Sequence, residues 1–354
     1  MEIIPSIPKI NIGTRIICAQ EPCYVIAEIG VNHNGSVNLA HTLIEEAKKA
    51  GADAAKFQMF DAKSLASQNA AKADYQTRET GAGSQLEMLE NLTLTHNEFL
   101  ELKTHCDESG IDFICTAFDA DSLQNVVQLN PVCLKWPSGE INNYQFLETA
   151  AQTNLPMILS TGMASIAEIA KAIDIFESMS KCGIAILQCV SSYPAQGKDQ
   201  NLNCISTMAA TFQKPTGFSD HTAGSACLLA ARALGMCILE KHFTLDSKMR
   251  GPDHKASMMP ADFSKMITDL RMVEAALGDG VKKITEDEKE IKSVARKSIV
   301  YSYDLPEGHL LTKDDLKIKR PGNGLAPSSI KFVLGRRLKK AIRQDDQVNL
   351  DNFI

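Results

Sequence analysis

The feature that most constrains the fold is a regular alternation of short apolar runs with amphipathic helical segments between residue 24 and about residue 278. Most of the runs are almost continuously apolar, which is typical of parallel strands covered on both faces. They lie at 24–30, 54–60, 112–118, 132–139, 157–163, 184–190, 217–221 and 237–244. Segments between them, such as 37–52, carry apolar residues at helical spacing. Eight strand–helix units over about 250 residues predict a (β/α)8 barrel or a doubly wound sheet.

The polar residues at the ends of these runs favour the barrel. Nearly every run ends in side chains that carry chemistry: Glu28, Lys56, Gln58, Thr116, Lys135, Ser138, Glu140, Ser160, Ser191, Tyr193, Ser219, Asp220, His221, Glu240, Lys241 and His242. In a barrel the carboxyl ends of all strands meet at one mouth, whereas a doubly wound sheet gathers such residues at one switch point. We therefore predict an α/β protein with a TIM barrel and an active site at its mouth.

The segments on either side of the barrel predict the domain organisation. Residues 10–26 are expected to form a small hairpin at the barrel floor, with its turn near Glu21 and Pro22. We expect the hairpin and barrel to occupy residues 1–280, and the charged stretch 281–296 to be a linker. Residues 297–354 are expected to form a small β-rich domain with one helical piece at 327–337.

Composition excludes several classes of protein. The net charge of -6 and the pI near 5.8 argue against a nucleic-acid-binding surface. The apolar runs are far shorter than the roughly 20 residues of a membrane-spanning helix, and the start of the chain lacks the pattern of a signal peptide. The ten cysteines show no CxxC spacing and are expected to be reduced core residues. We expect a cytoplasmic protein with small-molecule partners and no nucleic-acid or membrane partner.

Two histidines suggest a metal site. His221 and His242 close consecutive predicted strands and should be neighbours at the mouth. Imidazole binds Mn, Fe, Co or Zn, and two ligands leave coordination positions for water or substrate. Hydrogen bonds from the same histidines to a phosphate or substrate are the alternative.

Three lysines lie inside or directly after apolar strands, where an unpaired ammonium is costly. Lys56, Lys135 and Lys241 therefore need anionic partners, either a substrate or a buried carboxylate. A lysine that forms a Schiff base is a further reading. The strand-end hydroxyls suit phosphate or carboxylate oxygens, and they are Thr116, Ser138, Ser160 and Ser219. Glu28 and Glu140 are candidates for a general base or for an acceptor from a sugar hydroxyl.

Two segments after strands two and eight are expected to cover the mouth, namely 83–94 and 251–260. The second makes Asp253 and His254 candidates for substrate contact. In the tail domain, Arg320 precedes a tight Pro-Gly turn. The glycine-rich Walker A motif that binds ATP and the Rossmann glycine motif that binds NAD are both absent from the sequence, so neither cofactor is expected.

Eight motifs together resemble one known family. AEIGVNHNG, AAKFQ, PSGE, LSTGM, GFSDHTAG, EKHFTLD, GPDHKAS and KRPGNG occur in this order over nearly the whole chain. This succession closely resembles the sialic acid synthase family. The resemblance implies a (β/α)8 barrel followed by an antifreeze-like (SAF) domain. It also implies condensation of phosphoenolpyruvate with an N-acylated hexose, in a homodimer where the tail domain of one chain covers the other chain's barrel.

The resemblance also implies roles for individual residues. A divalent metal, usually Mn²⁺ with Mg²⁺ or Co²⁺ as alternatives, would bind His221 and His242. Phosphoenolpyruvate would contact Lys56, Thr116, Lys135, Ser138, Ser160 and Ser219, and the sugar would contact Gln58, Glu140, Tyr193, Asp253 and a partner chain's Arg320. Ser191, a further candidate for a phosphate or carboxylate contact, is shorter than the Asn or Thr-Glu that some members carry there. Trp136 replaces a smaller aliphatic residue.

The chemistry that the resemblance implies agrees with the residues identified at the strand ends. Glu28 is our candidate for stabilising a cation at the second carbon of phosphoenolpyruvate and for steering water to it. The leading expectation is formation of N-acetylneuraminate from N-acetylmannosamine, and legionaminate formation from 2,4-diacetamido-2,4,6-trideoxymannose is the alternative. A pyruvate Schiff-base aldolase and a carbohydrate- or ice-binding protein are less favoured. His33 is expected to order a loop rather than bind metal.

Overall fold

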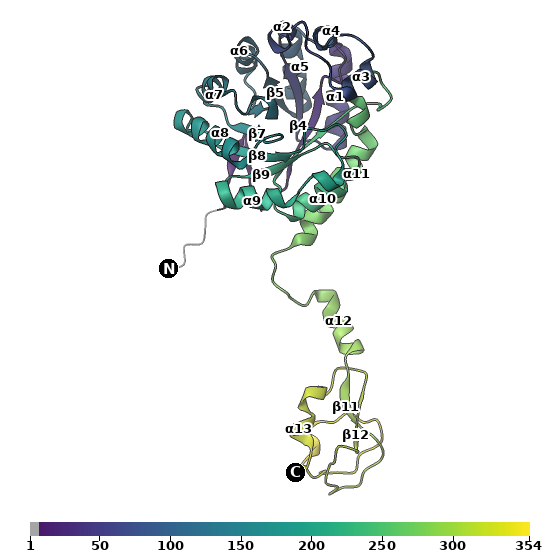
Figure 1. The fold of residues 1–354 in the computed structure, drawn as a ribbon. Helices are drawn as coiled ribbons and strands as arrows, with labels where there is room; N and C mark the ends of the chain where they lie inside the picture. The colour runs from purple at the N-terminus through teal and green to yellow at the C-terminus, as the bar shows by residue number, and fades with distance from the viewer. Residues whose placement is uncertain (1–6) are drawn as a thin grey trace. The chain divides into compact units, whose positions relative to one another are not determined.

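A computed structural model describes residues 7–354, which form two compact units divided between Gly278 and Asp279 (Figure 1). Residues 1–6, on which the expectation of no signal peptide partly rests, lie outside the described residues. Within residues 7–354, no helix combines the length and the apolar composition needed to cross a membrane.

The first unit is a closed parallel barrel, which confirms the predicted fold class. Within the described residues, eight strands form the ring in chain order, and the last pairs with the first. They are β3 (Tyr24–Gly30), β4 (Ala54–Met59), β5 (Asp112–Ala117), β6 (Leu134–Trp136), β7 (Met157–Ser160), β8 (Ile184–Cys189), β9 (Thr216–Asp220) and β10 (Ile238–His242). Nearly all strand residues are buried, as expected for strands with a packed interior and a cover of helices.

Helices connect successive strands and cover the ring (Figure 1). They are α1 (Val37–Ala50), α5 (His96–Ser109), α6 (Ala120–Gln128), α7 (Tyr144–Ala151), α8 (Ile166–Met179), α9 (Asn203–Phe212), α10 (Ala226–Ala233) and α11 (Pro260–Leu277). Sequence signals set their ends: Ser36 caps α1 by accepting from the amide of Leu39, and Gly51 ends it with a left-handed φ of 97°. Short helices α2 (Ala62–Leu65), α3 (Asp74–Thr80) and α4 (Gln85–Glu90) are inserted between β4 and α5.

The amino-terminal half of the barrel interior is apolar and sealed by the hairpin. Inward side chains such as Tyr24, Ile26 and Ile114 pack with Ile10 and Ile17 of the hairpin. The hairpin therefore packs on the barrel floor as expected. Its strands are β1 (Ile10–Ile12) and β2 (Arg15–Ile17). The predicted turn near Glu21 and Pro22 is wrong, because Gly13, with a φ of 55°, already reverses the chain.

Outward strand residues form the second core, between the ring and its helices. Trp136 belongs to it; its ring centre lies 4.7 Å from that of Phe146 of α7, and its indole N–H donates to the carbonyl of Glu140. This tryptophan therefore supports the segment after β6 from outside the barrel. The ten cysteines are all free thiols, as expected, and most of them are buried.

The second unit has its own core around Ile299, Tyr301, Val333 and Leu338. Its paired strands are β11 (Ser298–Tyr301) and β12 (Leu316–Lys319), which run antiparallel. The stretch expected to be a linker contains helix α12 (Glu286–Ala295), whose residues are all exposed. The helical piece expected at 327–337 is shorter, with a 3-10 turn at Pro327–Ser329 and α13 at Ile330–Val333.

A buried carboxylate organises the second unit. Asp315 accepts hydrogen bonds from the Tyr303 hydroxyl at 2.6 Å, from His309 Nε2 at 2.9 Å, and from the amide and hydroxyl of Thr312 at 2.6 and 2.7 Å. Burial alone would raise the pKa of Asp315, but these donors outweigh it and hold the pKa well below its usual range.

Asp315→Asn is expected to lower the free energy of unfolding of this unit by about 2 kcal/mol at pH 7, because hydrogen bonds to a charged group contribute about 1.5–3 kcal/mol. The folded-state pKa is depressed, so the stabilisation is present above about pH 4 and is lost as the pH falls further. Hydrogen exchange of β11 amides in the full chain measures the difference. Asp314→Asn alters an exposed neighbouring carboxylate and should match wild type; equal protection in both variants at pH 7 contradicts the assignment.

Candidate active site

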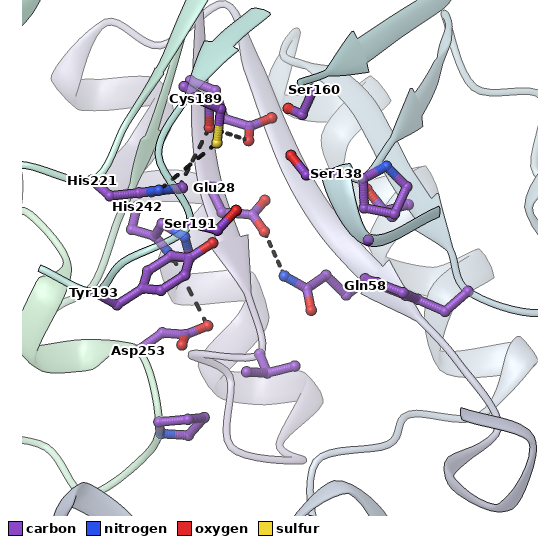
Figure 2. Close-up of a pocket in the computed structure, with 18 of the residues that line it drawn as sticks. Glu28, Gln58, Ser138, Ser160, Cys189, Ser191, Tyr193, His221, His242 and Asp253 are labelled. Atoms are coloured by element: carbon purple, nitrogen blue, oxygen red, sulfur yellow. Dashed lines mark hydrogen bonds and ion pairs between the residues drawn. The ribbon is translucent and has the colours of Figure 1, made fainter. Parts of the chain in front are cut away.

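A cavity of about 320 Å³ opens at the carboxyl ends of the barrel strands (Figure 2). The structure brings most of the predicted site residues to its wall: Glu28, Lys56, Gln58, Thr116, Lys135, Ser138, Ser160, Ser191, Tyr193, Ser219, His221, His242 and Asp253. Their convergence follows from the strand register, which places Glu28 beside both Lys56 and His242.

Four buried charges lie at the centre of the cavity. Lys56 Nζ is 2.7 Å from a carboxylate oxygen of Glu28. Glu240 lies between the two lysines, 3.8 Å from Lys56 and 3.6 Å from Lys135. Each of the four side chains is at most 7% exposed. Since an isolated buried charge is costly, the two carboxylates act as counterions that keep the lysines charged inside the barrel.

The pKa values of these groups follow from burial and mutual charge. Burial would raise the pKa of Glu240, but the ammonium groups of Lys135 and Lys56 hold it at about 2. Burial would lower the pKa of Lys56, but Glu240 and Glu28 raise it above its ordinary value. Burial lowers the pKa of Lys135, and it raises the pKa of Glu28 by more than Lys56 lowers it. Of these two carboxylates, Glu28 is therefore the one that takes up a proton more readily.

Hydroxyl groups surround the lysines. Lys135 donates to Ser160 Oγ at 2.7 Å, and Lys56 lies 3.4 Å from Thr116 Oγ1. Ser138 Oγ accepts from the amide of Gly162 at 2.8 Å. A Cβ on Gly162 would overlap the hydroxyls of Ser138 and Ser191, so glycine is required for these groups to converge. Clustered hydroxyls, an amide and two ammonium groups can together bind a phosphate and a carboxylate.

The two histidines face the same cavity with lone pairs available. His221 Nδ1 is 2.8 Å from the carbonyl of Val190, which can only accept, so Nδ1 carries the proton and Nε2, which lies 3.5 Å from Ser219 Oγ, presents its lone pair. His242 Nδ1 is buried and has no hydrogen-bond partner among the described residues. The ring centres are 5.4 Å apart. Burial lowers the pKa of both imidazoles, and His221 lowers that of His242 further.

These features fit a divalent metal held by two imidazoles. Neutral imidazole is the form that binds a metal. His221 donates its Nδ1 proton to a carbonyl, as metal-binding histidines usually do, and His242 has a buried nitrogen without a hydrogen-bond partner among the described residues. Asp253 Oδ2 lies 3.9 Å from His242 Nδ1. Within residues 7–354, no cluster of three or more His, Cys, Asp or Glu side chains has metal-binding geometry. Water or substrate would have to complete the coordination.

The outer part of the cavity suits a polar acceptor. Gln58 donates to Glu28 at 2.7 Å, and the Tyr193 ring lies 4.2 Å from the ring of His221 (Figure 2). Burial, with a smaller contribution from Glu28, raises the pKa of Asp253 to about 6. Tyr75 of α3 packs 5.3 Å from Tyr193, measured between ring centres.

Two loops are joined beside the cavity. After β3, Asn32 donates to the carbonyl of Phe243 and to Ser257 Oγ, both at 2.9 Å. Asn34 lies 3.2 Å from His254 Nε2, and the other nitrogen of His254 lies 2.7 Å from Thr244 Oγ1. The loop that follows β10 and carries Asp253 is therefore fixed to the first βα turn.

Several predicted residues lie elsewhere. Glu140 is not on the cavity wall and accepts from Asn143 at 2.7 Å. His254 belongs to the loop anchor just described. Lys241 points to the outside of the ring and pairs with Asp220 at 2.8 Å, so its anionic partner is a buried carboxylate. Arg320 lies in the second unit, where its Nε donates to the carbonyl of Ala295.

His33 is buried, and its Nδ1 accepts from the amide of Gly35 at 3.1 Å, which agrees with the expected loop-ordering role.

Some residues on the cavity wall were missed at the sequence level. Glu240 was noted at a strand end without a role, although strand alternation places it on the same face as His242. Cys189 was assigned to the core, yet it follows the same alternation at the end of β8 and lines the cavity. Tyr75 and Gln76 come from the inserted helix α3, and no pattern in the sequence points to them.

The fold and the cavity define a class: a (β/α)8 enzyme whose mouth is built for an anionic substrate. Comparison with known proteins specifies the family. The profile described as "NeuB family" matches residues 43–282, and the SAF domain profile matches residues 296–354. The chain belongs to the NeuB family of sialic acid synthases, as the motifs predicted.

Individual relatives cover nearly the whole chain. An N,N'-diacetyllegionaminic acid synthase of Legionella pneumophila is 42% identical over 93% of this chain and 94% of its own length. The human N-acetylneuraminate-9-phosphate synthase is 34% identical over 94% and 93%. The solved N-acetylneuraminic acid synthetase of Leptospira borgpetersenii is similar with a TM-score of 0.73 and 34% identity, covering 80% of this chain and 95% of that one.

Glu240→Gln is expected to lower the free energy of unfolding by about 3 kcal/mol, because it leaves Lys135 without its carboxylate. The same change leaves the cavity more positive, so its affinity for inorganic phosphate should rise about tenfold, or about 1.4 kcal/mol. Thermal unfolding and calorimetric titration with phosphate measure both effects. Glu140→Gln, at a carboxylate off the cavity wall, should change neither; unchanged or weaker phosphate binding by Glu240→Gln contradicts the counterion role.

Proposed function

We propose that this chain is a transferase that condenses phosphoenolpyruvate with an N-acylated hexose, forming a nine-carbon sugar acid and releasing phosphate. The observation that carries the proposal is that two buried lysines and two neutral imidazoles face one cavity. N-acetylmannosamine, giving N-acetylneuraminate, is the leading acceptor. The trideoxy diacetamido sugar that gives legionaminate is the alternative. The name of the Leptospira relative supports the first acceptor, and the name of the Legionella relative supports the second. We expect the reaction in the cytoplasm.

Phosphoenolpyruvate would bind at the inner end of the cavity. Lys56 and Thr116 suit its carboxylate, because an ammonium and a hydroxyl 3.4 Å apart can both donate to its oxygens. Lys135 suits the phosphate, with hydroxyls that include Ser160. The remaining donors around the phosphate would be Ser138, Ser191 and Ser219. This arrangement leaves the methylene carbon directed toward the acceptor.

His221 and His242 would hold the divalent metal, for which Mn²⁺ is the leading choice. When bound there, the metal would polarise the aldehyde oxygen of the open-chain sugar. The protein's own contribution is to keep both imidazoles neutral and fixed, through burial and through the bond from His221 to Val190. Gln58, Tyr193 and Asp253 would orient the acceptor.

The bond changes balance with one water molecule. The methylene carbon of phosphoenolpyruvate forms a bond to the aldehyde carbon, whose oxygen gains a proton and becomes a hydroxyl. Positive charge then develops at the second carbon, where the Glu28 carboxylate stabilises it and accepts a proton from the attacking water. The bond between this carbon and the phosphate oxygen breaks, and phosphate leaves as the added water oxygen loses its second proton and becomes the keto oxygen. The two protons of the water thus end on the new hydroxyl and on the released phosphate.

Purified protein supplied with phosphoenolpyruvate, Mn²⁺ and each acceptor separately should release phosphate and form the matching sugar acid. If the bridging oxygen of phosphoenolpyruvate carries ¹⁸O, the label should appear in the released phosphate, because the carbon–oxygen bond breaks. Chelation with EDTA should abolish turnover, and added Mn²⁺ should restore it. Label retained in the sugar acid, or no turnover with any N-acyl hexose, contradicts the proposal.

One observation favours a second candidate, an aldolase that forms a Schiff base with pyruvate. Burial lowers the pKa of Lys135, and a neutral amine is what such chemistry needs. Borohydride reduction in the presence of pyruvate distinguishes the two. The primary proposal expects no covalent adduct on Lys135 by mass spectrometry.

The proposed dimer has Arg320 of the partner subunit contacting the sugar's acyl group. His221→Ala and Arg320→Ala dimers should each be nearly inactive. When the two are mixed, dissociated and reassociated, hybrid dimers contain one site with a wild-type barrel and a wild-type tail. Such hybrids should recover about half of wild-type activity, because one of their two sites is intact. No recovery, with hybrid formation verified by mass spectrometry, contradicts tail exchange.

A further inference from the structure

The outside of the ring carries a buried ion pair directly behind the two histidines. Lys241 Nζ lies 2.8 Å from Asp220 Oδ2 and donates to the carbonyl of Thr222 at 2.7 Å. Asp220 Oδ1 accepts from the amide and the hydroxyl of Thr222, at 2.8 and 2.7 Å. Both charged side chains are at most 2% exposed. The pair lies on the opposite face of its strands from the cavity and contributes no group to it.

The position of this ion pair in the strand register relates it to the histidines. Asp220 and Lys241 are the last residues that β9 and β10 pair with each other. His221 and His242 follow directly, so each imidazole lies one residue beyond this paired position. His242 is also paired with Glu28 on β3, whereas His221 lies past the end of β9.

The backbone around His221 is fixed largely by this ion pair. The carbonyl of His221 accepts from the amide of Ala195 at 2.8 Å. The peptide groups of Thr222 are bound on one side by Asp220 and on the other by Lys241. An apolar pair would fill the same space with a smaller desolvation cost, but it would supply none of these directional bonds. The arrangement thus fixes the segment that carries His221 against β10, which carries His242.

We propose that Asp220 and Lys241 are positioning residues that set the spacing of the two imidazoles for metal binding. The inference rests on the proposed function to the extent that His221 and His242 are the metal ligands. Groups that orient metal ligands from outside the coordination shell typically change metal affinity by 10- to 100-fold when they are altered.

The test is Mn²⁺ binding to the full chain, measured from the electron paramagnetic resonance signal of free Mn²⁺. Asp220→Asn combined with Lys241→Met removes both charges and leaves neither unpaired in the interior. The Kd for Mn²⁺ should rise at least tenfold in this double variant. Thr222→Val removes a single hydrogen bond and keeps the side-chain shape, so it should fold and give a smaller rise in the same direction.

A second buried ion pair provides the control. Arg232 and Glu274 are 3.1 Å apart and 5% and 11% exposed, and Arg232 also donates to the carbonyls of Ala19, Glu21 and Met236, which precede strands β3 and β10 at the end of the barrel away from the histidines. Arg232→Met combined with Glu274→Gln should lower the melting temperature as much as the first double variant while leaving the Kd for Mn²⁺ unchanged. A merely structural role for Asp220 and Lys241 predicts the same behaviour for both double variants.

The outcomes separate the two ideas. Wild-type Mn²⁺ affinity in a folded Asp220/Lys241 double variant overturns the positioning role and leaves the proposed function intact. If that variant does not fold, unchanged affinity in Thr222→Val overturns it instead. If wild-type protein binds Mn²⁺ no better than His221→Ala, the metal site itself is wrong, and both ideas fail together.

Discussion

Every inward side chain of the barrel has to fit within the ring that β10 closes against β3. Toward the amino ends of the strands the ring is filled with apolar groups such as Tyr24 and Ile26, and the hairpin seals it. Toward the carboxyl ends the same alternation directs charged groups inward, and these can stay there only in compensating pairs. Glu28 and Glu240 supply that compensation, so the ring determines both the core and the electrostatics of the site.

The site thus consists of oppositely charged, buried groups held at fixed distances. An arriving anion meets Lys56 and Lys135 on either side of Glu240, whose carboxylate the two ammonium groups hold ionised. The imidazoles stay neutral in the same cavity, because burial opposes their protonation. Such preorganisation requires no rearrangement of dipoles during the reaction, which is the main way in which a rigid scaffold lowers a barrier.

The barrel and most of the cavity wall could be predicted from the sequence. Active sites of such barrels lie at the carboxyl ends of the strands, so the predicted strand ends identify residues such as Lys56 and His221. The side of the ring to which each side chain points was harder to predict. Glu240 and Lys241 are adjacent in the sequence, and only the alternation of side chains counted back from His242 shows that Glu240 points inward and Lys241 outward. Glu140 follows β6 in a 3-10 turn, where alternation no longer applies. The hairpin turn was misplaced because Pro22 is a stronger turn signal than Gly13.

The bonds of Asn32 and Asn34 to the loop after β10 have a consequence for substrate traffic. They join the first and last repeats of the ring, so the loop that carries Asp253 moves only together with the first βα turn. Helix α4 packs through a small separate apolar cluster that includes Met88 and, from the first turn, Val31. Local opening costs least where few apolar contacts must be broken. The segment that packs through this cluster therefore opens at the lowest cost, while the asparagine bonds hold the loop after β10 in place.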